Sequence, residues 1–181
     1  MRIISGIHKG RKIIAPQKLP VRPTTDRAKE SLFNILRNTY NFSQVHVLDL
    51  YAGTGNISFE FASRGVPSVI AVDENSGCVR FIAETAEKLE IPIETVKSDV
   101  SEYLKHTLNT FDIIFADPPY DFEQSLFLSV IDLVFEKNHL NEGGMLVIEH
   151  SKHTDLSMHS SFNEIRNYGG SAFSFFSSWK I

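Results

Sequence analysis

The sequence predicts an α/β fold in which helices cover both faces of a mostly parallel sheet. From residue 45 onward, short β-prone apolar runs alternate with longer runs of helical periodicity, an order typical of parallel strands joined by helices. The chain closes with two β-prone runs around Gly169 and Gly170, so the last strand is expected to enter the sheet antiparallel. These runs together predict a Rossmann-like sheet of seven strands.

Each element can be placed approximately from the same pattern. Strands are expected at about 45–51, 69–73, 93–97, 111–116, 144–149, 162–168 and 172–181. Helices are expected between them, at about 56–64, 76–90, 100–107 and 122–136. The length of 181 residues fits a single domain. We expect this domain to span residues 1–181, with a core over 41–181 and an extension over 1–40.

The extension is expected to consist of a small β-hairpin and a helix. Two β-prone runs in residues 1–15 flank a turn that contains glycine, which favours a hairpin. Thr24-Thr25-Asp26 supplies residues that cap helices, and the apolar side chains that follow have helical spacing. We expect a helix over about 27–36 that packs on the core and carries two basic side chains outward, Arg27 and Lys29.

Positive charge is concentrated in this extension. Residues 1–40 contain nine Lys and Arg against two acidic residues, whereas residues 41–181 contain nine against 20, which gives a net charge of −4. A local excess of positive charge is typical of surfaces that contact phosphate groups, although a solvated arm would have the same composition. The side chains expected to contact nucleic acid are Lys9, Arg11, Lys12 and Arg22.

The composition favours a soluble cytoplasmic protein. The single cysteine, Cys78, cannot form an internal disulfide, which suits a reducing compartment. No apolar stretch approaches the length of a membrane span, and the first residues lack the apolar core of a signal peptide. We therefore expect no association with a membrane.

An apolar run with a carboxylate leads into a glycine turn in the stretch Val47-Leu48-Asp49-Leu50-Tyr51-Ala52-Gly53-Thr54-Gly55. A buried strand that passes through a glycine turn into a helix is where parallel α/β sheets hold nucleotides. A dinucleotide fingerprint would place a third glycine at Ser58, so a nicotinamide cofactor is the least favoured. The turn instead resembles the first motif of S-adenosylmethionine-dependent methyltransferases, although another Rossmann-like use is open. The residues expected to bind the cofactor here are Asp49, Tyr51, Ala52, Gly53 and Gly55.

Two further strand ends carry candidate cofactor ligands. Asp73 ends the second predicted strand, where a carboxylate can accept two hydrogen bonds from a ribose diol, and Glu74 is its neighbour. Asp99 follows the third strand and could accept a hydrogen bond from the amine of an adenine. Backbone groups of Ser98 or Val100 could contact the adenine ring. Helix capping explains Asp99 equally well.

The fourth strand ends in Asp117-Pro118-Pro119-Tyr120. Two successive prolines stiffen the chain and remove two backbone donors. The amino group of a nucleobase is a poor nucleophile, because its lone pair is delocalised into the ring. Acceptors at Asp117 and the Pro118 carbonyl can orient this amine toward a methyl donor, while the Tyr120 ring stacks on the base.

This tetrad resembles the Asn/Asp/Ser-Pro-Pro-Tyr/Phe/Trp motif of amino-group methyltransferases. Taken with the glycine turn and the amino-terminal motifs, it makes the chain similar to the bacterial 16S ribosomal RNA (guanine(966)-N2)-methyltransferase family of class I S-adenosylmethionine-dependent enzymes. The amino-terminal motifs are Arg2-Ile3-Ile4-Ser5-Gly6, Gly10-Arg11, Arg22-Pro23-Thr24-Thr25-Asp26-Arg27 and Glu30-x-x-Phe33-Asn34.

The resemblance implies methylation of the 2-amino group of one guanine in 16S ribosomal RNA, free or in a small-subunit assembly particle, with no obligate protein partner. It implies that the methionine end of the cofactor meets Asp49, Gly53 and Gly55, that the ribose meets Asp73 and the adenine Asp99, and that the target base meets residues 117–120. It further implies that a motif with Thr24, Thr25 and Arg27 folds over the cofactor, while the basic hairpin meets RNA.

Other interpretations of the same residues differ in substrate or in class. The tetrad permits adenine N6 in DNA or RNA equally, and a non-catalytic RNA-binding assembly module could share the fold. A metal site is not expected, because Glu149, His150, His153 and His159 do not have the spacing of known ligand sets.

Overall fold

The computed structural model describes residues 1–16, 18–19, 25–119 and 122–179. Its strands form one seven-stranded sheet in the order β3-β2-β1-β4-β5-β7-β6. The strands are β1 (His46–Leu50), β2 (Ser68–Asp73), β3 (Ile93–Lys97), β4 (Phe111–Ala116), β5 (Leu140–Ser151), β6 (Phe162–Tyr168) and β7 (Ser171–Phe176). The helices are α1 (Asp26–Thr39), α2 (Asn56–Ser63), α3 (Ser76–Leu89), α4 (Val100–His106) and α5 (Gln124–Glu136), with a short 3-10 turn at Phe42–Gln44.

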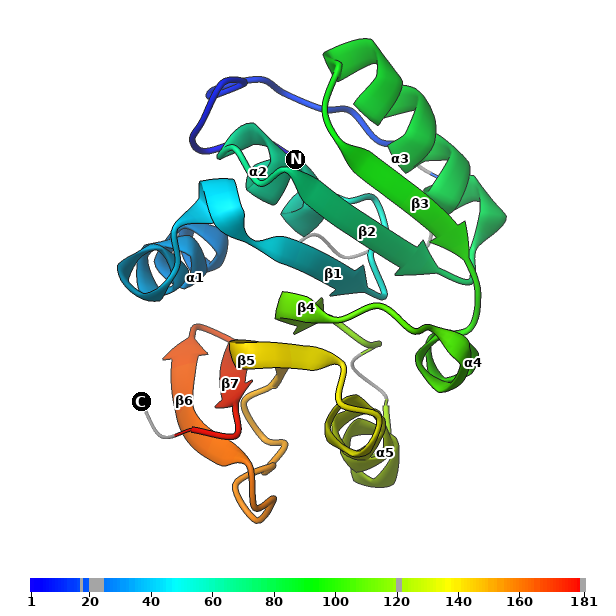
Figure 1. Cartoon of the computed structure of the whole chain (residues 1–181). Coiled ribbons are helices and arrows are strands. Elements are labelled where there is room, and N and C mark those ends of the chain that lie inside the picture. Colours follow the sequence, from blue (N-terminus) through cyan, green and yellow to red (C-terminus); the bar gives the residue numbers. More distant parts are fainter. Residues whose placement is uncertain (17, 20–24, 120–121, 180–181) are drawn as a thin grey trace.

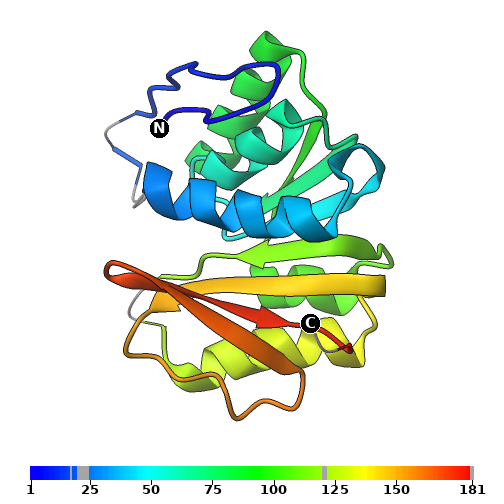
Figure 2. The same ribbon diagram turned by 90° about the vertical axis from the view of Figure 1, so that its left-hand side faces the viewer.

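The sheet has the predicted mixed topology. Strands β1 to β5 pair parallel, and β7 pairs antiparallel with both β5 and β6. Figures 1 and 2 show the layers, with α1, α2 and α3 on one face of the sheet and α4 and α5 on the other. The prediction of a Rossmann-like sheet with helices on both faces is therefore confirmed.

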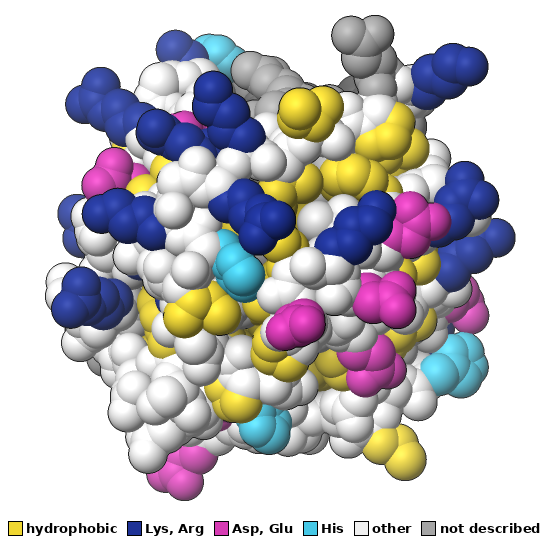
Figure 3. All heavy atoms as spheres, turned by 90° about the horizontal axis from the view of Figure 1, so that it is seen from above, with side chains coloured by type: hydrophobic (Ala, Val, Ile, Leu, Met, Phe, Trp, Pro, Cys, Tyr) yellow, Lys and Arg dark blue, Asp and Glu magenta, His cyan; other side chains and the backbone are white. Residues whose placement is uncertain are grey.

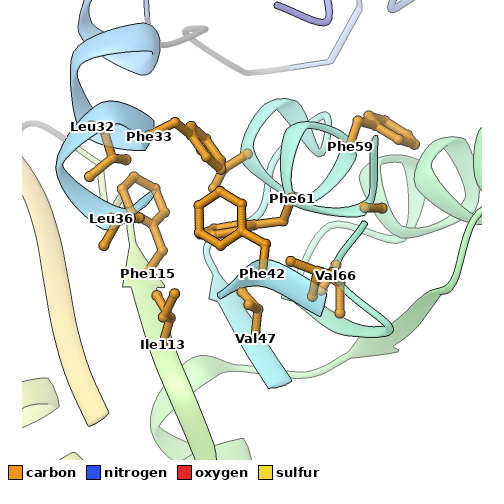
Figure 4. Packing of buried hydrophobic residues seen from close by; sticks show 14 of the residues in the cluster. Leu32, Phe33, Leu36, Phe42, Val47, Phe59, Phe61, Val66, Ile113 and Phe115 are labelled. Carbon is orange, nitrogen blue, oxygen red and sulfur yellow. The ribbon is translucent and has the colours of Figure 1, made fainter. Parts of the chain in front are cut away.

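Alternation along the central strands explains why both faces are covered. In β1, Val47 contributes to the apolar cluster under α1, α2 and α3, whereas Leu48 contributes to the cluster under α4 and α5. Aromatic rings from separate elements pack together in the first cluster. The ring centroids of Phe33 in α1 and Phe61 in α2, for example, are 4.5 Å apart (Figure 4). Asp49 shares the face of Val47, so the alternation directs its side chain toward α2.

Helix α1 is longer than predicted, and one of its basic side chains points the other way. Thr25 caps it, with its hydroxyl accepting a hydrogen bond from the Ala28 N–H at 3.2 Å. Arg27 is exposed, as expected. Lys29, however, is only 1 % exposed, so the expectation that it points outward is wrong. It is buried because a carboxylate on α2, Glu60, lies 3.4 Å from its ammonium.

The predicted amino-terminal hairpin is present as a short one, with an antiparallel bridge between Arg2 and Lys12 and a hydrogen bond from the Ile3 N–H to the Arg11 carbonyl at 3.0 Å. The N–H groups of Ile4 and Ser5 donate to the Glu60 carboxylate, at 2.7 and 3.0 Å. Figure 1 shows the segment lying beside α2. The segment is thus anchored to a helix of the core.

The bounds of two strands differ from the predicted ones. Strand β5 begins at Leu140 rather than at 144, and β7 ends at Phe176, so the last predicted strand is shorter. Three predicted site residues lie outside the described residues: Arg22, Thr24 and Tyr120. Within the part of the chain that the structure describes, no helix is both long enough and apolar enough to span a membrane.

The backbone at Gly6 yields a first prediction. Gly6 and Gly10 both have positive φ, +87° and +84°, but a Cβ on Gly6 would lie 1.7 Å from the Ser63 carbonyl oxygen, whereas a Cβ on Gly10 meets nothing within 4 Å. Gly10→Ala should lower the free energy of unfolding by about 1–2 kcal/mol, the cost of a left-handed alanine. Gly6→Ala should lower it clearly more, since the segment must also move from α2.

Urea denaturation of both variants measures this difference directly. Equal losses would mean that the close approach of Gly6 to α2 is not a constraint in solution.

Candidate active site at the carboxyl edge of the sheet

A cavity of about 630 Å³ opens at the carboxyl ends of the parallel strands. Its walls come from the ends of β1, β2, β3 and β4 and from the segments that follow them. In parallel α/β sheets this edge is where ligands bind. The volume is within the range of cavities that hold nucleotide-sized molecules.

The glycine turn after β1 is held in shape from the next strand. The Gly53 N–H donates to Asp73 Oδ2 at 2.7 Å, and the Gly55 N–H donates to the Ala52 carbonyl at 2.7 Å. Gly55 has φ of +76°, and a Cβ there would lie 2.9 Å from the Ile82 side chain. Gly53 therefore lines the cavity, whereas Gly55 is needed for the approach of α2 to α3.

Asp49 is a buried carboxylate beneath this turn. It lines the cavity and accepts hydrogen bonds from the Ser58 N–H at 3.0 Å and from the Ser58 hydroxyl. Burial raises the pKa of Asp49 to about 7, although the bonds from Ser58 act in the opposite direction. A group that loses its proton near neutral pH responds strongly to any cation placed beside it.

The β2 end brings two carboxylates to the cavity. Asp73 is partly buried, and its Oδ1 accepts from the Asn75 N–H at 2.8 Å while its Oδ2 holds Gly53. Glu74 is exposed and also lines the cavity. Asp73 thus shapes the turn, and each of its oxygens has a further lone pair for a ligand hydroxyl.

Asp99 has the capping role that the sequence left open. It is the N-cap of α4, and its Oδ1 accepts from the Glu102 N–H at 2.9 Å. Ser98 and Val100 beside it also line the cavity. Capping and ligand binding are compatible, because Asp99 itself is exposed and borders the same cavity.

Tyr51 and Phe122 form an aromatic wall. Tyr51 has a positive φ of 56°, and its pKa is raised by burial and by the nearby carboxylates of Asp99 and Glu74. Its ring centroid lies 5.7 Å from that of Phe122, in an edge-on arrangement. Phe122 was not predicted, although an aromatic residue so soon after the tetrad was a visible signal.

The tetrad follows β4 at the same edge. Asp117, Pro118 and Pro119 all line the cavity, and the Asp117 N–H donates to the Leu50 carbonyl of β1 at 3.3 Å. The Phe122 N–H donates to the Pro119 carbonyl at 3.0 Å. Asp117 therefore borders the same cavity as the glycine turn, on a segment stiffened by two prolines.

Of the predicted cofactor and catalytic residues that the structure describes, most meet in this cavity and three do not. Thr25 caps α1, Arg27 is exposed, and Gly55 packs toward the core, so none of them lines it. Sequence reasoning missed several small or apolar lining residues, which carry no distinctive pattern: Thr54, Asn56, Ile57, Asn75, Cys78, Ser101, Phe115 and Leu126. Burial raises the pKa of the Cys78 thiol to about 11, so this group is neutral at ordinary pH.

The predicted RNA-contacting side chains lie on the surface. Lys9, Arg11 and Lys12 are exposed, and Arg2 forms an ion pair with Asp26 at 3.0 Å. Figure 3 views the molecule from above relative to Figure 1, and most of the Lys and Arg side chains on this face lie in the upper half of the picture. Such an arrangement is suited to a phosphate backbone.

The histidines near the end of β5 have structural partners. His150 Nε2 lies 2.7 Å from the Ser174 hydroxyl, and burial lowers the pKa of His150. His159 pairs with Asp132 at 3.2 Å. Among the described residues, no group of three or more His, Cys, Asp or Glu side chains could hold a metal ion.

Comparison with known proteins decides the family. A family model described as "Conserved hypothetical protein 95" matches residues 1–177. The ribosomal RNA small subunit methyltransferase D of Haemophilus influenzae is 31% identical over 161 residues, which cover 86% of this chain and 81% of that protein. The chain belongs to the ribosomal RNA small subunit methyltransferase D family. The protein of the same name from Buchnera aphidicola subsp. Acyrthosiphon pisum is 32% identical over 152 residues, which cover 83% of this chain and 78% of that protein.

Solved structures agree on the fold. A hypothetical protein of Thermus thermophilus superposes with a TM-score of 0.83 and 24% identity, covering 98% of this chain and 99% of that one. Membership of the family implies S-adenosylmethionine as the methyl donor.

The buried Asp49 predicts a pH dependence of stability. In the unfolded chain its pKa returns to about 3.8, so between pH 4 and 7 the folded chain retains a proton that the unfolded chain has released. This contribution to the free energy of unfolding is present below pH 4 and is lost as pH rises through about 7, with a slope of up to about 1.4 kcal/mol per pH unit.

Asp49→Asn removes this ionisation. The stability of the variant relative to the original chain should therefore rise between pH 5 and 7 and level off above pH 8, as measured by urea denaturation at each pH. Parallel stability curves would mean that Asp49 is already ionised across this range.

Proposed function

We propose that this protein transfers a methyl group from S-adenosylmethionine to the exocyclic 2-amino group of a guanine in 16S ribosomal RNA, and that this guanine is guanine 966. The observation that carries the proposal is that Asp117-Pro118-Pro119 borders the same cavity as the glycine turn and Asp73. The relatives named for ribosomal RNA small subunit methylation support the RNA substrate. The motifs that resemble the guanine-N2 enzymes support the choice of base.

The residues of the cavity fit S-adenosylmethionine, which when bound supplies a methyl group on a positively charged sulfur. Gly53 lines the cavity without a side chain, so a ligand can approach the main chain there, and position 58 holds serine rather than a phosphate-binding glycine. Asp73 would accept hydrogen bonds from the ribose hydroxyls, and Asp49 would face the positively charged methionine end. Tyr51 and Val100 provide apolar surface for the remainder.

Asp117 would position the acceptor. Its carboxylate can accept a hydrogen bond from the guanine amine, which turns the nitrogen lone pair toward the donor. The bond from the Asp117 N–H to the Leu50 carbonyl holds this acceptor to β1, so little reorganisation is needed at the moment of reaction. As the nitrogen gains a methyl group it becomes strongly acidic, and Asp117 is the residue with an ionisable side chain among the described part of the tetrad, so it can take the proton.

The target base must leave its stack to reach this position. The cavity lies at the edge of the sheet, and Asp117 is half-buried within it, so a base inside a duplex cannot approach it. The substrate should therefore be a loop nucleotide, or one in partly assembled RNA. Pro119 and Leu126 are exposed and line the cavity, so they are available to contact such a base.

The test of this function is a methyl-transfer assay followed by nucleoside analysis. Radiolabelled S-adenosylmethionine is incubated with unmodified small-subunit RNA, both free and bound by ribosomal proteins. Label in N2-methylguanosine at position 966 is expected. Label in N6-methyladenosine would replace the substrate, and cofactor binding without transfer to any RNA would favour a non-catalytic assembly module.

Replacement of Asp117 separates catalysis from cofactor binding. Asp117→Ala should lower turnover by a factor of at least about 100, the usual effect of removing an electrostatic acceptor from an active site. The affinity for S-adenosylhomocysteine, measured by calorimetry, should stay within a few fold. A large loss of that affinity would instead assign Asp117 to cofactor binding.

The basic segment can be tested through the salt dependence of RNA binding. Neutralising Arg11 and Lys12 together should weaken binding and reduce the slope of log affinity against log salt by up to about two, one for each lost phosphate contact. Neutralising Lys88 and Lys137, which are exposed on α3 and after α5, is the matched control. An unchanged slope in the first variant would remove the segment from the RNA interface.

A further inference from the structure

The ammonium of Lys29 joins three parts of the molecule. Its Nζ lies 2.7 Å from the carbonyl of Arg2 in the amino-terminal segment, 2.8 Å from Asn56 Oδ1 at the start of α2, and 3.4 Å from Glu60 Oε2 further along that helix. An ammonium has three hydrogens, and each can be directed at one of these oxygens. Lys29 itself belongs to α1.

One of these partners is part of the active site. Asn56 lines the cavity and is the first residue of α2, directly after the glycine turn. Arg2, on the other side, is paired with Lys12 in the segment that carries the exposed basic side chains. A buried Lys29 thus connects the wall of the cofactor cavity to the surface proposed to meet RNA.

The segment depends on α2 for its position. Besides the bonds from Ile4 and Ser5 to Glu60, the Ile7 N–H donates to the Ser63 carbonyl at 2.8 Å, and the His8 N–H donates to the Ser63 hydroxyl at 3.0 Å. A segment held by a few backbone hydrogen bonds is in equilibrium between a state docked on α2 and a locally released state. Any ligand that holds the start of α2 in its docked geometry favours the first state.

Anchoring alone does not require a lysine. A buried ion pair is often no more stable than well-packed apolar side chains of the same volume. What an apolar residue could not supply are the directed hydrogen bonds to Asn56 and to the Arg2 carbonyl. Glu60 would keep a cationic partner without Lys29, because Arg64 Nε lies 2.7 Å from its Oε1.

We propose that Lys29 is a positioning residue that couples cofactor binding to docking of the amino-terminal segment. Resting on the proposed function, this means that a loaded cavity holds the RNA-contacting side chains more firmly in place. The coupling is reciprocal, so a docked segment also favours the cofactor. The coupling acts through the geometry of Asn56 in the wall of the cavity.

Hydrogen exchange of the full chain, followed by NMR, tests the coupling without RNA. Saturating S-adenosylhomocysteine should slow exchange of the Ile4 and Ser5 amides by at least about fivefold in the original chain, which is the lower range of allosteric coupling. Lys29→Met should bind the same ligand but lose this slowing. Lys29→Arg, which retains donors, should restore at least part of it, and the exposed Lys88→Met should behave like the original chain.

Asn56→Ala breaks the same link from the cavity side. In this variant the Ile4 and Ser5 amides should also lose the ligand-dependent slowing of exchange, which gives a second test if Lys29→Met does not fold. Slowing that persists in a folded Lys29→Met or in Asn56→Ala would overturn the proposal. Binding without any slowing in the original chain would overturn the coupling alone, whereas no binding of S-adenosylhomocysteine would overturn the proposed function and the coupling with it.

Discussion

The position of α2 is fixed by two buried carboxylates, and the rest of the site depends on it. Asp49 at the front binds Ser58 in the first turn of the helix, so the helix start is tied to β1. Glu60 lies further along the same helix, where it receives Lys29, Arg64 and two backbone N–H groups of the amino-terminal segment. Each charge is costly to bury alone, and each is compensated by donors from a different element.

This arrangement connects charge on the surface to chemistry at the sheet edge. The glycine turn is held from the next strand by Asp73, and the tetrad segment is held to β1 through the Leu50 carbonyl. The cavity therefore has walls from four strand ends whose spacing is set by the sheet itself. Rigid strand ends suit a reaction in which the main contribution of the protein is to orient an amine toward a methyl donor.

The sequence predicted the alternation of strands and helices, the antiparallel last strand and most of the cavity, because each depends on local pattern. Residues such as Asp73 and Asp117 stand at the ends of apolar runs, and strand ends of a parallel sheet meet at one edge. Lys29 was placed wrongly, because its burial depends on Glu60, 31 positions away, and no local pattern reveals that partner. The attachment of the hairpin to Glu60 was missed for the same reason, and Gly55 proved to serve helix packing, which depends on Ile82 of α3.

A crystal structure of the chain with S-adenosylhomocysteine tests the central claim most directly. We predict that the ligand occupies the cavity at the carboxyl edge, with its ribose hydroxyls on Asp73. Its sulfur, which carries the methyl group in S-adenosylmethionine, should face Asp117. A ligand bound elsewhere, or one whose sulfur points away from Asp117, would contradict this claim.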